Sequence, residues 1–312
     1  MASEPHASGA SGEPNASDAF RSGFACFVGR PNVGKSTLLN ALVGTKVAIT
    51  SSRPQTTRRV IRGVVHRPDA QLVVVDTPGL HRPRTLLGER LDSLVHSTLS
   101  EVDVIGFCVP ADESIGRGDR FIADQLSGIG NTPVVAVVTK ADAVAGARLA
   151  EQLVQVDRLG DWAEIVPVSA VTHYQLDVLT DLLVARLPVG GPLYPEGELT
   201  DEPEQILVAE LIREAALEGV RDELPHSIAV VVEEMLARED RDLVEVHAEL
   251  YVERPSQKAI VIGTGGQRLK EVGTRARQQI EALLGSRVFL DLRVKIAKDW
   301  QRDPKQLRRL GF

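Results

Sequence analysis

The chain has 312 residues, 43% of them hydrophobic, and a formal net charge of −7. Its length favours two domains, because a single hydrophobic core rarely extends beyond roughly 250–300 residues. It has no apolar run near the roughly 20 residues that span a bilayer and no signal-peptide start, and two cysteines in so long a chain argue against a secreted disulfide scaffold. We therefore expect a cytoplasmic protein without a transmembrane segment.

The first two-thirds of the chain predict an α/β domain. Residues 1–22, rich in Ala, Ser, Gly and Glu, read as a disordered extension. From residue 23 to 188, apolar strand-like runs alternate with helical stretches, which predicts a mainly parallel sheet with helices on both faces. The strand-like runs are 24–28, 72–75, 104–109, 133–138 and 165–166, and the helical stretches include 36–42, 87–97, 120–126 and 176–187.

A phosphate-binding pattern, G-x-x-x-x-G-K-[ST], lies between the first strand-like run and a helical stretch that begins at Ser36. In this context the backbone N–H groups of the loop point at phosphate oxygens, the Lys35 ammonium reaches the β/γ oxygens, and the Ser36 hydroxyl can ligate Mg²⁺. The sequence therefore predicts a site for a nucleoside triphosphate, with Lys35 in a catalytic role. The predicted residues here are Gly29, Arg30, Pro31, Asn32, Val33, Gly34, Lys35, Ser36 and Thr37.

A second motif, Asp76-Thr77-Pro78-Gly79, follows the apolar run 72–75, which is typical of a strand buried in a parallel sheet. An Asp at the carboxyl end of such a strand lies beside the phosphate loop. Asp76 can therefore hold Mg²⁺ through water, and the Gly79 N–H is placed to meet the γ-phosphate. Leu80, the next residue, is included in the predicted nucleotide site.

The base-reading element is Thr139-Lys140-Ala141-Asp142, which resembles the N-K-x-D motif of GTPases. Its Asp142 carboxylate can accept hydrogen bonds from the N1–H and the exocyclic amine of guanine, whereas adenine would leave that carboxylate unpaired. GTP is thus favoured over ATP. Thr139 stands where the family pattern usually has Asn, which puts affinity rather than base identity in question. Ser169 and Ala170 resemble the last guanine-side loop of the same family.

The polar segment 51–59 lies between the phosphate loop and the Asp76 motif and has no periodicity. In GTPases a switch loop at this place supplies a Thr to Mg²⁺ and the γ-phosphate. Thr57 is the first candidate for that catalytic and metal-binding role, and Thr56 is the second. With Ser36 and Asp76, Thr57 completes the predicted metal site.

The last third of the chain predicts a separate basic module. Residues 189–203, rich in Pro, Gly and acids, read as a linker. Residues 251–312 hold 14 Lys/Arg against 6 Asp/Glu, while the first 250 hold 22 against 37, so the C-terminal part is suited to meet a polyanion. A helix (204–223), two strands (227–237 and 243–252), a broken helix pair around 263–266 and a strand (288–296) resemble, in that order, the α+β type II KH fold over residues 204–297.

The break in that helix pair is a G-x-x-G loop, Gly263-Thr264-Gly265-Gly266. In KH domains such a loop clamps the backbone of about four single-stranded nucleotides. Many KH loops carry a Lys at one of the two variable positions, so phosphate attraction must here come from neighbouring cations. The predicted RNA-binding residues are Lys258, Gly263, Thr264, Gly265, Gly266, Arg268 and Lys270, and a basic tail follows over residues 298–312.

The motifs GRPNVGKST, PQTTR, DTPGLH, TKAD and VSA, followed by the KH-like pattern, resemble the Era family of bacterial GTPases over nearly the whole chain after about residue 22. The resemblance implies slow hydrolysis of GTP to GDP with Mg²⁺, binding to ribosomal RNA at the 3′ end of 16S rRNA, and a role in small-subunit maturation. Leu80 stands where Ras-like enzymes carry a Gln that orients the attacking water. Asn32 resembles the residue through which some relatives bind K⁺, so K⁺ is a further candidate cofactor.

Two other functions stay open at this point. One is a non-enzymatic RNA-binding protein that uses GTP or GDP only as an occupancy signal, which Leu80 and Thr139 favour. The other is a GTPase held peripherally at the inner face of the cell membrane by its basic C-terminus. We expect a monomer in each case.

Overall fold

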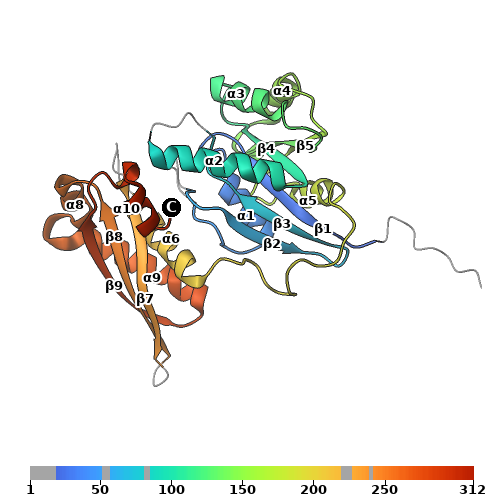
Figure 1. The fold of residues 1–312 in the computed structure, drawn as a ribbon. Coiled ribbons are helices and arrows are strands. Elements are labelled where there is room, and N and C mark those ends of the chain that lie inside the picture. Colours follow the sequence, from blue (N-terminus) through green and yellow to red (C-terminus); the bar gives the residue numbers. More distant parts are fainter. Residues whose placement is uncertain (1–18, 51–56, 81–84, 219–226, 239–241) are drawn as a thin grey trace, which may run out of the picture.

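The computed structural model describes residues 19–50, 57–80, 85–218, 227–238 and 242–312. They form two bodies that lie side by side (Figure 1), the first built on a six-stranded sheet and the second on a three-stranded sheet. Among the described residues, no helix has both the length and the apolar character needed to cross a bilayer.

The first sheet contains β1 (Arg21–Val28), β2 (Ile61–His66), β3 (Ala70–Asp76), β4 (Val104–Pro110), β5 (Val134–Thr139) and β6 (Glu164–Pro167). Their order is β2-β3-β1-β4-β5-β6, and every neighbouring pair is parallel except β2 and β3. The helices are α1 (Lys35–Val43), α2 (Leu86–Glu101), α3 (Arg117–Leu126), α4 (Gly146–Asp157) and α5 (Leu176–Val184), with a 3₁₀ turn η1 (Ala141–Ala143) after β5.

Both faces of this sheet are buried, as the continuous apolar runs predicted. In β1, Ala25 and Phe27 pack in one cluster with residues of α1 and α5, while Cys26 and Val28 pack in the other with residues of α2, α3 and α4. Successive strand residues point to opposite faces, so an uninterrupted apolar strand supplies two cores at once. The carboxyl ends of β1, β3 and β5 then lie together at one edge.

The structure adds an edge strand that the sequence did not indicate. β2 pairs antiparallel with β3. Its outer side receives part of the predicted linker, because the Val64 N–H donates to the Leu199 carbonyl at 2.9 Å. The Gln71 side-chain oxygen accepts from the N–H groups of Leu193 (2.6 Å) and Tyr194 (2.8 Å). The segment between the two bodies is therefore fastened along the first sheet.

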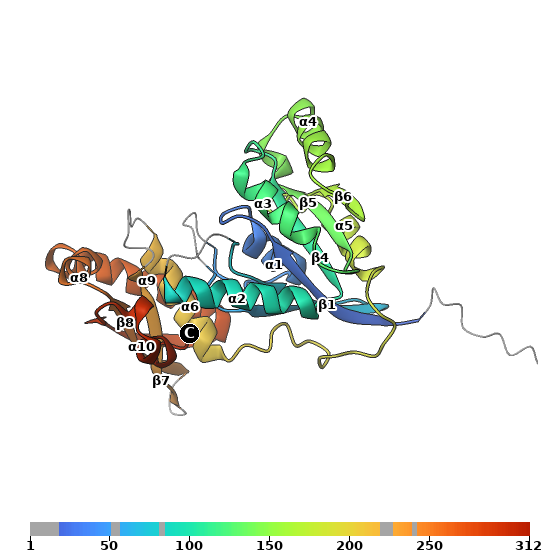
Figure 2. The same ribbon diagram turned by 45° about the horizontal axis from the view of Figure 1, so that its top comes forward.

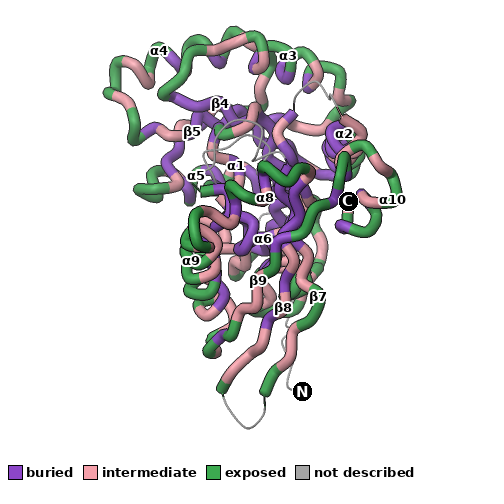
Figure 3. The backbone as a smooth tube through the Cα atoms, turned by 90° about the vertical axis from the view of Figure 1, so that its left-hand side faces the viewer, coloured by how far each residue is buried: buried purple, intermediate pink, exposed green. Residues whose placement is uncertain are grey.

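The second body follows the predicted element order. It contains α6 (Glu204–Leu217), β7 (Ala229–Arg238), β8 (Leu243–Val252), α8 (Pro255–Ile262), the 3₁₀ turn η2 (Thr264–Gly266), α9 (Gln267–Leu284) and β9 (Arg287–Ile296). β8 lies between β7, to which it is antiparallel, and β9, to which it is parallel. α6 is buried along almost its whole length, whereas α4 and α9 carry many exposed positions (Figure 3).

The final segment packs between the two bodies (Figure 2). It forms the 3₁₀ turn η3 (Trp300–Arg302) and α10 (Pro304–Arg309). Leu307 and Leu310 share a buried cluster with Leu87 and Leu91 of α2, and Trp300 in the same cluster is fully buried. The basic tail of the sequence is thus an interdomain element with an apolar inner side.

Candidate functional site

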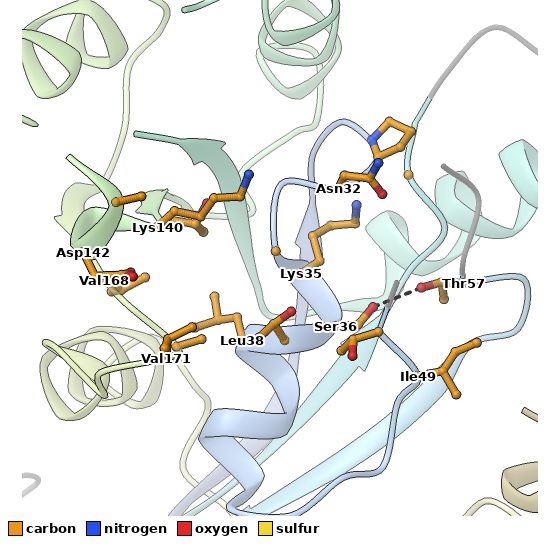
Figure 4. A pocket seen from close by; sticks show the side chains of 18 residues that line it. Asn32, Lys35, Ser36, Leu38, Ile49, Thr57, Lys140, Asp142, Val168 and Val171 are labelled. Atoms are coloured by element: carbon orange, nitrogen blue, oxygen red, sulfur yellow. Dashed lines mark hydrogen bonds between the residues drawn. The ribbon is translucent and has the colours of Figure 1, made fainter. Parts of the chain in front are cut away.

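A pocket of about 330 Å³ opens at the carboxyl edge of the first sheet (Figure 4). It runs from the phosphate loop to η1, which follows β5. Its lining residues are Pro31, Asn32, Gly34, Lys35, Ser36, Thr37, Leu38, Ile49, Thr50, Thr57, Gly79, Thr139, Lys140, Asp142, Ala143, Val168, Ala170 and Val171. Twelve of these belong to the predicted nucleotide site. They come from loops that are far apart in the chain and that parallel strands bring to one edge.

At one end of the pocket, the phosphate loop wraps around the Lys35 side chain. The Lys35 ammonium donates to the carbonyls of Gly29 (3.2 Å) and Arg30 (3.0 Å), and the residue is only 6% exposed. Burial lowers the pKa of Lys35, although the negative charge of Asp76 opposes that shift. A phosphate anion would supply a counter-ion to this desolvated cation, and the N-terminus of α1, which begins at the same residue, adds N–H donors.

Three oxygen-bearing side chains meet below the loop. Asp76 Oδ2 accepts hydrogen bonds from the hydroxyls of Ser36 (2.8 Å) and Thr57 (3.0 Å), and these two hydroxyls lie 3.1 Å apart. The second carboxylate oxygen, Oδ1, is buried and has no hydrogen-bond partner in the described structure. Hydroxyl and carboxylate oxygens are the ligands that Mg²⁺ prefers, so this group fits the metal that the sequence predicted.

Burial raises the pKa of Asp76, and the hydrogen bonds from Ser36 and Thr57, together with the charge of Lys35, pull it back. An unpartnered, buried carboxylate oxygen is costly. A divalent cation bound at this place would offset that cost, which is the physical reason for expecting one here.

The base-reading element lies at the other end of the pocket. Lys140 has a left-handed backbone (φ 57°), and its ammonium lies 3.2 Å from an Asp112 carboxylate oxygen. Asp142, in η1, is exposed and lines the pocket. Thr139 is buried, and its hydroxyl donates to the Val33 carbonyl at 2.6 Å, which joins β5 to the phosphate loop.

Gly79 lies where the chain passes closest to the phosphate loop. A Cβ atom built on Gly79 would lie 2.9 Å from the backbone nitrogen of Pro31, a separation too short for a side chain. Glycine is therefore required for this approach, which brings the Gly79 backbone to the lining of the pocket.

Several predicted site residues lie behind the pocket wall. Gly29 and Val33 contribute backbone carbonyls, the Thr77 hydroxyl donates to the Phe27 carbonyl at 2.8 Å, and the Ser169 oxygen accepts from the Thr172 N–H at 3.0 Å. Pro78, Leu80 and Ala141 are buried, and Arg30 is directed to Asp119. Thr56 lies outside the described residues.

Sequence reasoning missed six lining residues: Leu38, Ile49, Thr50, Ala143, Val168 and Val171. Most are apolar and contribute surface rather than polar groups. A signal existed for Val168, which is the first residue of the recognised VSA motif although only Ser169 and Ala170 were assigned to the site, and for Ala143, which follows the recognised TKAD motif. Ile49 and Thr50 precede the polar segment and carried no pattern of their own.

A separate glycine loop joins α8 to α9 in the second body. Gly263, Gly265 and Gly266 have positive φ angles of 72°, 60° and 79°. Thr264 and Gly265, at the tip, are exposed. No heavy atom lies within 4 Å of a Cβ built on Gly265, so the tip is open to a ligand. The loop therefore has the backbone accessibility that contact with a phosphate chain requires.

The three predicted cations around this loop differ in exposure and in hydrogen bonding. Lys270 is exposed and Lys258 is half-buried. Arg268 turns to the end of α6, where one guanidinium nitrogen donates to the Glu218 carbonyl at 2.8 Å. Of the three, Lys258 and Lys270 are the better placed to meet an anion, and Arg268 would first have to leave this contact.

The fold and the pocket together define a phosphate-loop GTPase domain joined to a KH domain. The family model described as "50S ribosome-binding GTPase" matches residues 24–140, and the model described as "KH domain" matches residues 223–301. The chain is 69% identical over 311 residues to GTPase Era of Streptomyces coelicolor, covering 97% of this chain and 98% of that protein. It is 70% identical over 296 residues to GTPase Era of Mycobacterium sp. strain KMS, covering 94% and 99%. The chain belongs to the Era family of GTPases.

Solved structures of this family agree with the fold. Era of Aquifex aeolicus, solved as a variant bound to GDP and AlF4−, has a TM-score of 0.90 and 38% identity, covering 94% of this chain and 99% of that one. Era in complex with MgGDPNP and nucleotides 1506–1542 of 16S ribosomal RNA has a TM-score of 0.88 and 39% identity with the same coverage. The chain is thus a GTPase that hydrolyses GTP to GDP and phosphate with Mg²⁺, and the resemblance found in its motifs is confirmed.

Proposed function

We propose that this GTPase is a switch whose nucleotide state controls the grip of its KH domain on ribosomal RNA during assembly of the small subunit. The Era complex with 16S ribosomal RNA supports RNA as the partner. The open glycine loop and the basic C-terminal region support the KH domain as the contact. The observation that carries the proposal is a buried link between the KH domain and the polar segment 51–59, which we call the switch segment.

That link is Arg58, the residue after Thr57. Its guanidinium donates to the Ile228 carbonyl at 2.7 Å and lies 5.7 Å from the centre of the Trp300 ring, and the residue is 2% exposed. Burial lowers the pKa of Arg58, and Arg213 lowers it further, against the opposing charges of Glu210 and Glu253. Displacing Thr57 by even a few ångströms would therefore disturb a buried cation that is held by the KH domain.

The chain just before the switch segment 51–59 is also fixed to the KH side. Ile49 packs in the hydrophobic core of the KH body. The Thr50 N–H and hydroxyl donate to Glu214 Oε1 at 2.8 and 3.1 Å, and Lys46 forms an ion pair with the same carboxylate. Ile49 and Thr50 on one side and Arg58 on the other are thus each anchored on the KH body. A change at the nucleotide that moves Thr57 therefore has a direct route to that body.

In the proposed hydrolysis, the residues of this chain mainly position charge. Lys35 binds the β/γ oxygens, and the Gly79 N–H meets the γ-phosphate. Ser36, Thr57 and Asp76 would hold Mg²⁺, which neutralises phosphate charge when bound. Asp142 reads the guanine edge.

Leu80 accounts for the slow rate that we propose. Its side chain is 4% exposed and packs in the apolar cluster under α2. An aliphatic group in that position cannot orient the attacking water by hydrogen bonding. Efficient hydrolysis therefore needs another group, and K⁺ held at Asn32 is the candidate.

The RNA contact is tested by charge. Replacing Thr264 and Gly265 by Asp should repel the RNA backbone, while the double change to Asn, which keeps size and tolerates the positive φ, serves as the matched control. We expect RNA with the sequence of nucleotides 1506–1542 to lose affinity for the Asp variant only. Parent binding should weaken with salt by a log–log slope of about −0.7 per phosphate neutralised. Equal RNA affinity of the two variants would refute the clamp.

The coupling is tested by comparing RNA affinity with GDP and with a non-hydrolysable GTP analogue. We expect a difference of about 1–3 kcal/mol in the parent. Arg58→Met should shrink it by removing the donor and the charge. Arg62→Met, which removes a surface cation of β2 that pairs with Asp201, should not. Identical parent affinities in the two states would refute the coupling and leave both binding sites standing.

We further propose that the protein acts as a monomer in the cytoplasm, which sedimentation analysis of the purified chain tests. The alternative is peripheral attachment to a membrane, and α10 supplies the observation that favours it, because Lys305, Arg308 and Arg309 are all exposed. Co-sedimentation with anionic vesicles decides between the two, since only attachment predicts salt-sensitive binding to them.

A further inference from the structure

Thr139 occupies a position between the two ends of the nucleotide pocket. It is the last residue of β5 and is 4% exposed, yet it belongs to the pocket lining. Its hydroxyl donates to the Val33 carbonyl at 2.6 Å. A threonine hydroxyl has one proton, and a carbonyl oxygen can only accept. Toward the pocket, residue 139 can therefore offer lone pairs but no donor.

The two edges of guanine need different hydrogen-bond partners: one edge donates and the other accepts. The N1–H and the exocyclic amine are donors, which suit the carboxylate of Asp142, whereas N7 and O6 are acceptors. Thr139, Asp142 and the phosphate loop line the same pocket. If the phosphates lie at the loop and the donor edge of the base lies at Asp142, the five-membered ring that carries N7 would lie between them, beside Thr139. The N7 acceptor would then face the lone pairs of the Thr139 hydroxyl, which are acceptors too.

Lys140 does not replace the missing donor. Its ammonium lies 3.2 Å from Asp112 and 3.7 Å from Glu113, so it is drawn to these carboxylates. The Lys140 ammonium is thereby paired with two carboxylates.

We propose that Thr139 anchors the phosphate loop and leaves N7 of guanine without a side-chain donor, so that this GTPase accepts 7-deazaguanine nucleotides as readily as guanine nucleotides. The inference rests on the proposed assignment of Asp142 to the guanine base. Thr139 would then set specificity because it offers no hydrogen-bond donor to N7. An Asn at the same position has two amide N–H groups, one to keep the bond to Val33 and one to direct at N7.

The test uses 7-deaza-GDP, in which a C–H replaces N7 and O6 is kept. GDP and 7-deaza-GDP compete against a fluorescent GDP bound to the full-length chain with Mg²⁺. We expect affinities within about twofold of each other for the parent. For Thr139→Asn we expect GDP to bind roughly three- to tenfold more tightly than 7-deaza-GDP, the worth of one hydrogen bond. A parent that prefers GDP by about fivefold or more would overturn the inference, since it would show that N7 is read.

Two variants separate anchoring from base reading. Thr139→Ser keeps the hydroxyl and should behave as the parent does. Thr139→Val keeps the shape but loses the bond to Val33, so it should weaken GDP and 7-deaza-GDP by the same factor. Unequal weakening would assign the hydroxyl to the base and overturn the inference.

The inference and the proposed function fail in different ways. If Asp142→Asn binds GDP as tightly as the parent, the guanine assignment is wrong and this inference falls with it. If Asp142→Asn weakens GDP but the parent discriminates against 7-deaza-GDP, the site assignment stands and only the role of Thr139 is refuted.

Discussion

Arg30 of the phosphate loop forms an ion pair whose loss should lower the free energy of unfolding of the GTPase domain. Its Nε donates to Asp119 Oδ1 at 2.8 Å, and another guanidinium nitrogen lies 3.0 Å from Glu113. The Asp119 side chain is fully buried at the start of α3, where its other oxygen accepts from the Gly116 N–H at 2.8 Å. The counter-ion of a buried carboxylate is thus a residue of the nucleotide site.

The expected magnitude follows from burial. Two unit charges 2.8 Å apart attract by about 6 kcal/mol at an effective dielectric constant of about 20, before desolvation is subtracted. Stranding one partner of a fully buried pair costs about 3–5 kcal/mol. The Arg30 side chain is 26% exposed, so water screens part of this interaction. We therefore expect Arg30→Gln to destabilise the domain by about 2–4 kcal/mol and Asp119→Asn by about 1–2 kcal/mol, because the amide oxygen can still accept from Gly116.

The assay exploits the two tryptophans of the chain. In a Trp300→Phe background, Trp162 reports the GTPase domain alone, since its Nε1–H donates to Val156 at 2.8 Å and its ring lies 5.2 Å from that of Phe107. Urea unfolding gives the free energy for the parent, both single variants and the double variant. We expect the double variant to be less destabilised than the sum of the singles by about 1–2 kcal/mol.

Arg148→Gln is the matched control. Arg148 lies 3.6 Å from Glu151 on the exposed face of α4, and such surface pairs contribute at most about 1 kcal/mol. If Arg30→Gln costs no more than this control, or if the two single effects simply add, the buried-pair reasoning is wrong.

Three further predictions concern the nucleotide site. Lys35→Ala should weaken GTP binding about a hundredfold or more, the worth of two charge-assisted hydrogen bonds, and unchanged affinity in a fluorescent GTP titration would reject the site. K⁺ should accelerate GTP hydrolysis relative to Na⁺ if Asn32 helps to hold it, and equal phosphate-release rates in the two salts would remove that idea. Burial raises the pKa of Asp76 in the folded state, so the charge of Asp76 costs stability above the unfolded-state pKa. This cost is largest above the folded-state pKa, shrinks as the pH falls below it, and is gone once the pH lies below the unfolded-state pKa. Asp76→Asn should therefore raise the melting temperature at pH 7 without Mg²⁺ and abolish the Mg²⁺ dependence of GDP affinity, and a lower melting temperature would contradict the sign.

The local motifs could be recognised from the sequence because their chemistry depends on neighbours in the chain. The phosphate loop is one continuous turn from Gly29 to Ser36 that leads into α1. The fully buried strands could be recognised as continuous apolar runs, because a strand covered on both faces does not alternate between apolar and polar residues. The order of elements around the glycine loop was likewise sufficient to predict the KH fold.

Other features carried no local signal. β2 was missed because a short edge strand with one covered face carries only a weak hydrophobic pattern. Its place in the sheet is fixed by its hydrogen-bonded pairing with β3, which the sequence does not show. The segment 189–203 has the composition of a flexible linker, yet the Gln71 side chain and the Val64 N–H of β2 hydrogen-bond to its backbone groups. The segment contributes only backbone N–H and carbonyl groups to these bonds, so its own composition gives no sign of them. A composition rule cannot foresee a partner that lies over a hundred residues away.

The sequence by itself determined the class of protein, the nucleotide end of the site and the presence of a KH domain, because each is encoded by short local motifs or by the order of elements along the chain. Only the tertiary structure decided that Arg58 enters the KH body beside Trp300, that Glu214 holds Thr50, and that the Thr139 hydroxyl serves Val33. These contacts join positions far apart in the chain. They depend on how two cores pack against each other, and that packing is set by the sum of many weak interactions rather than by any one motif.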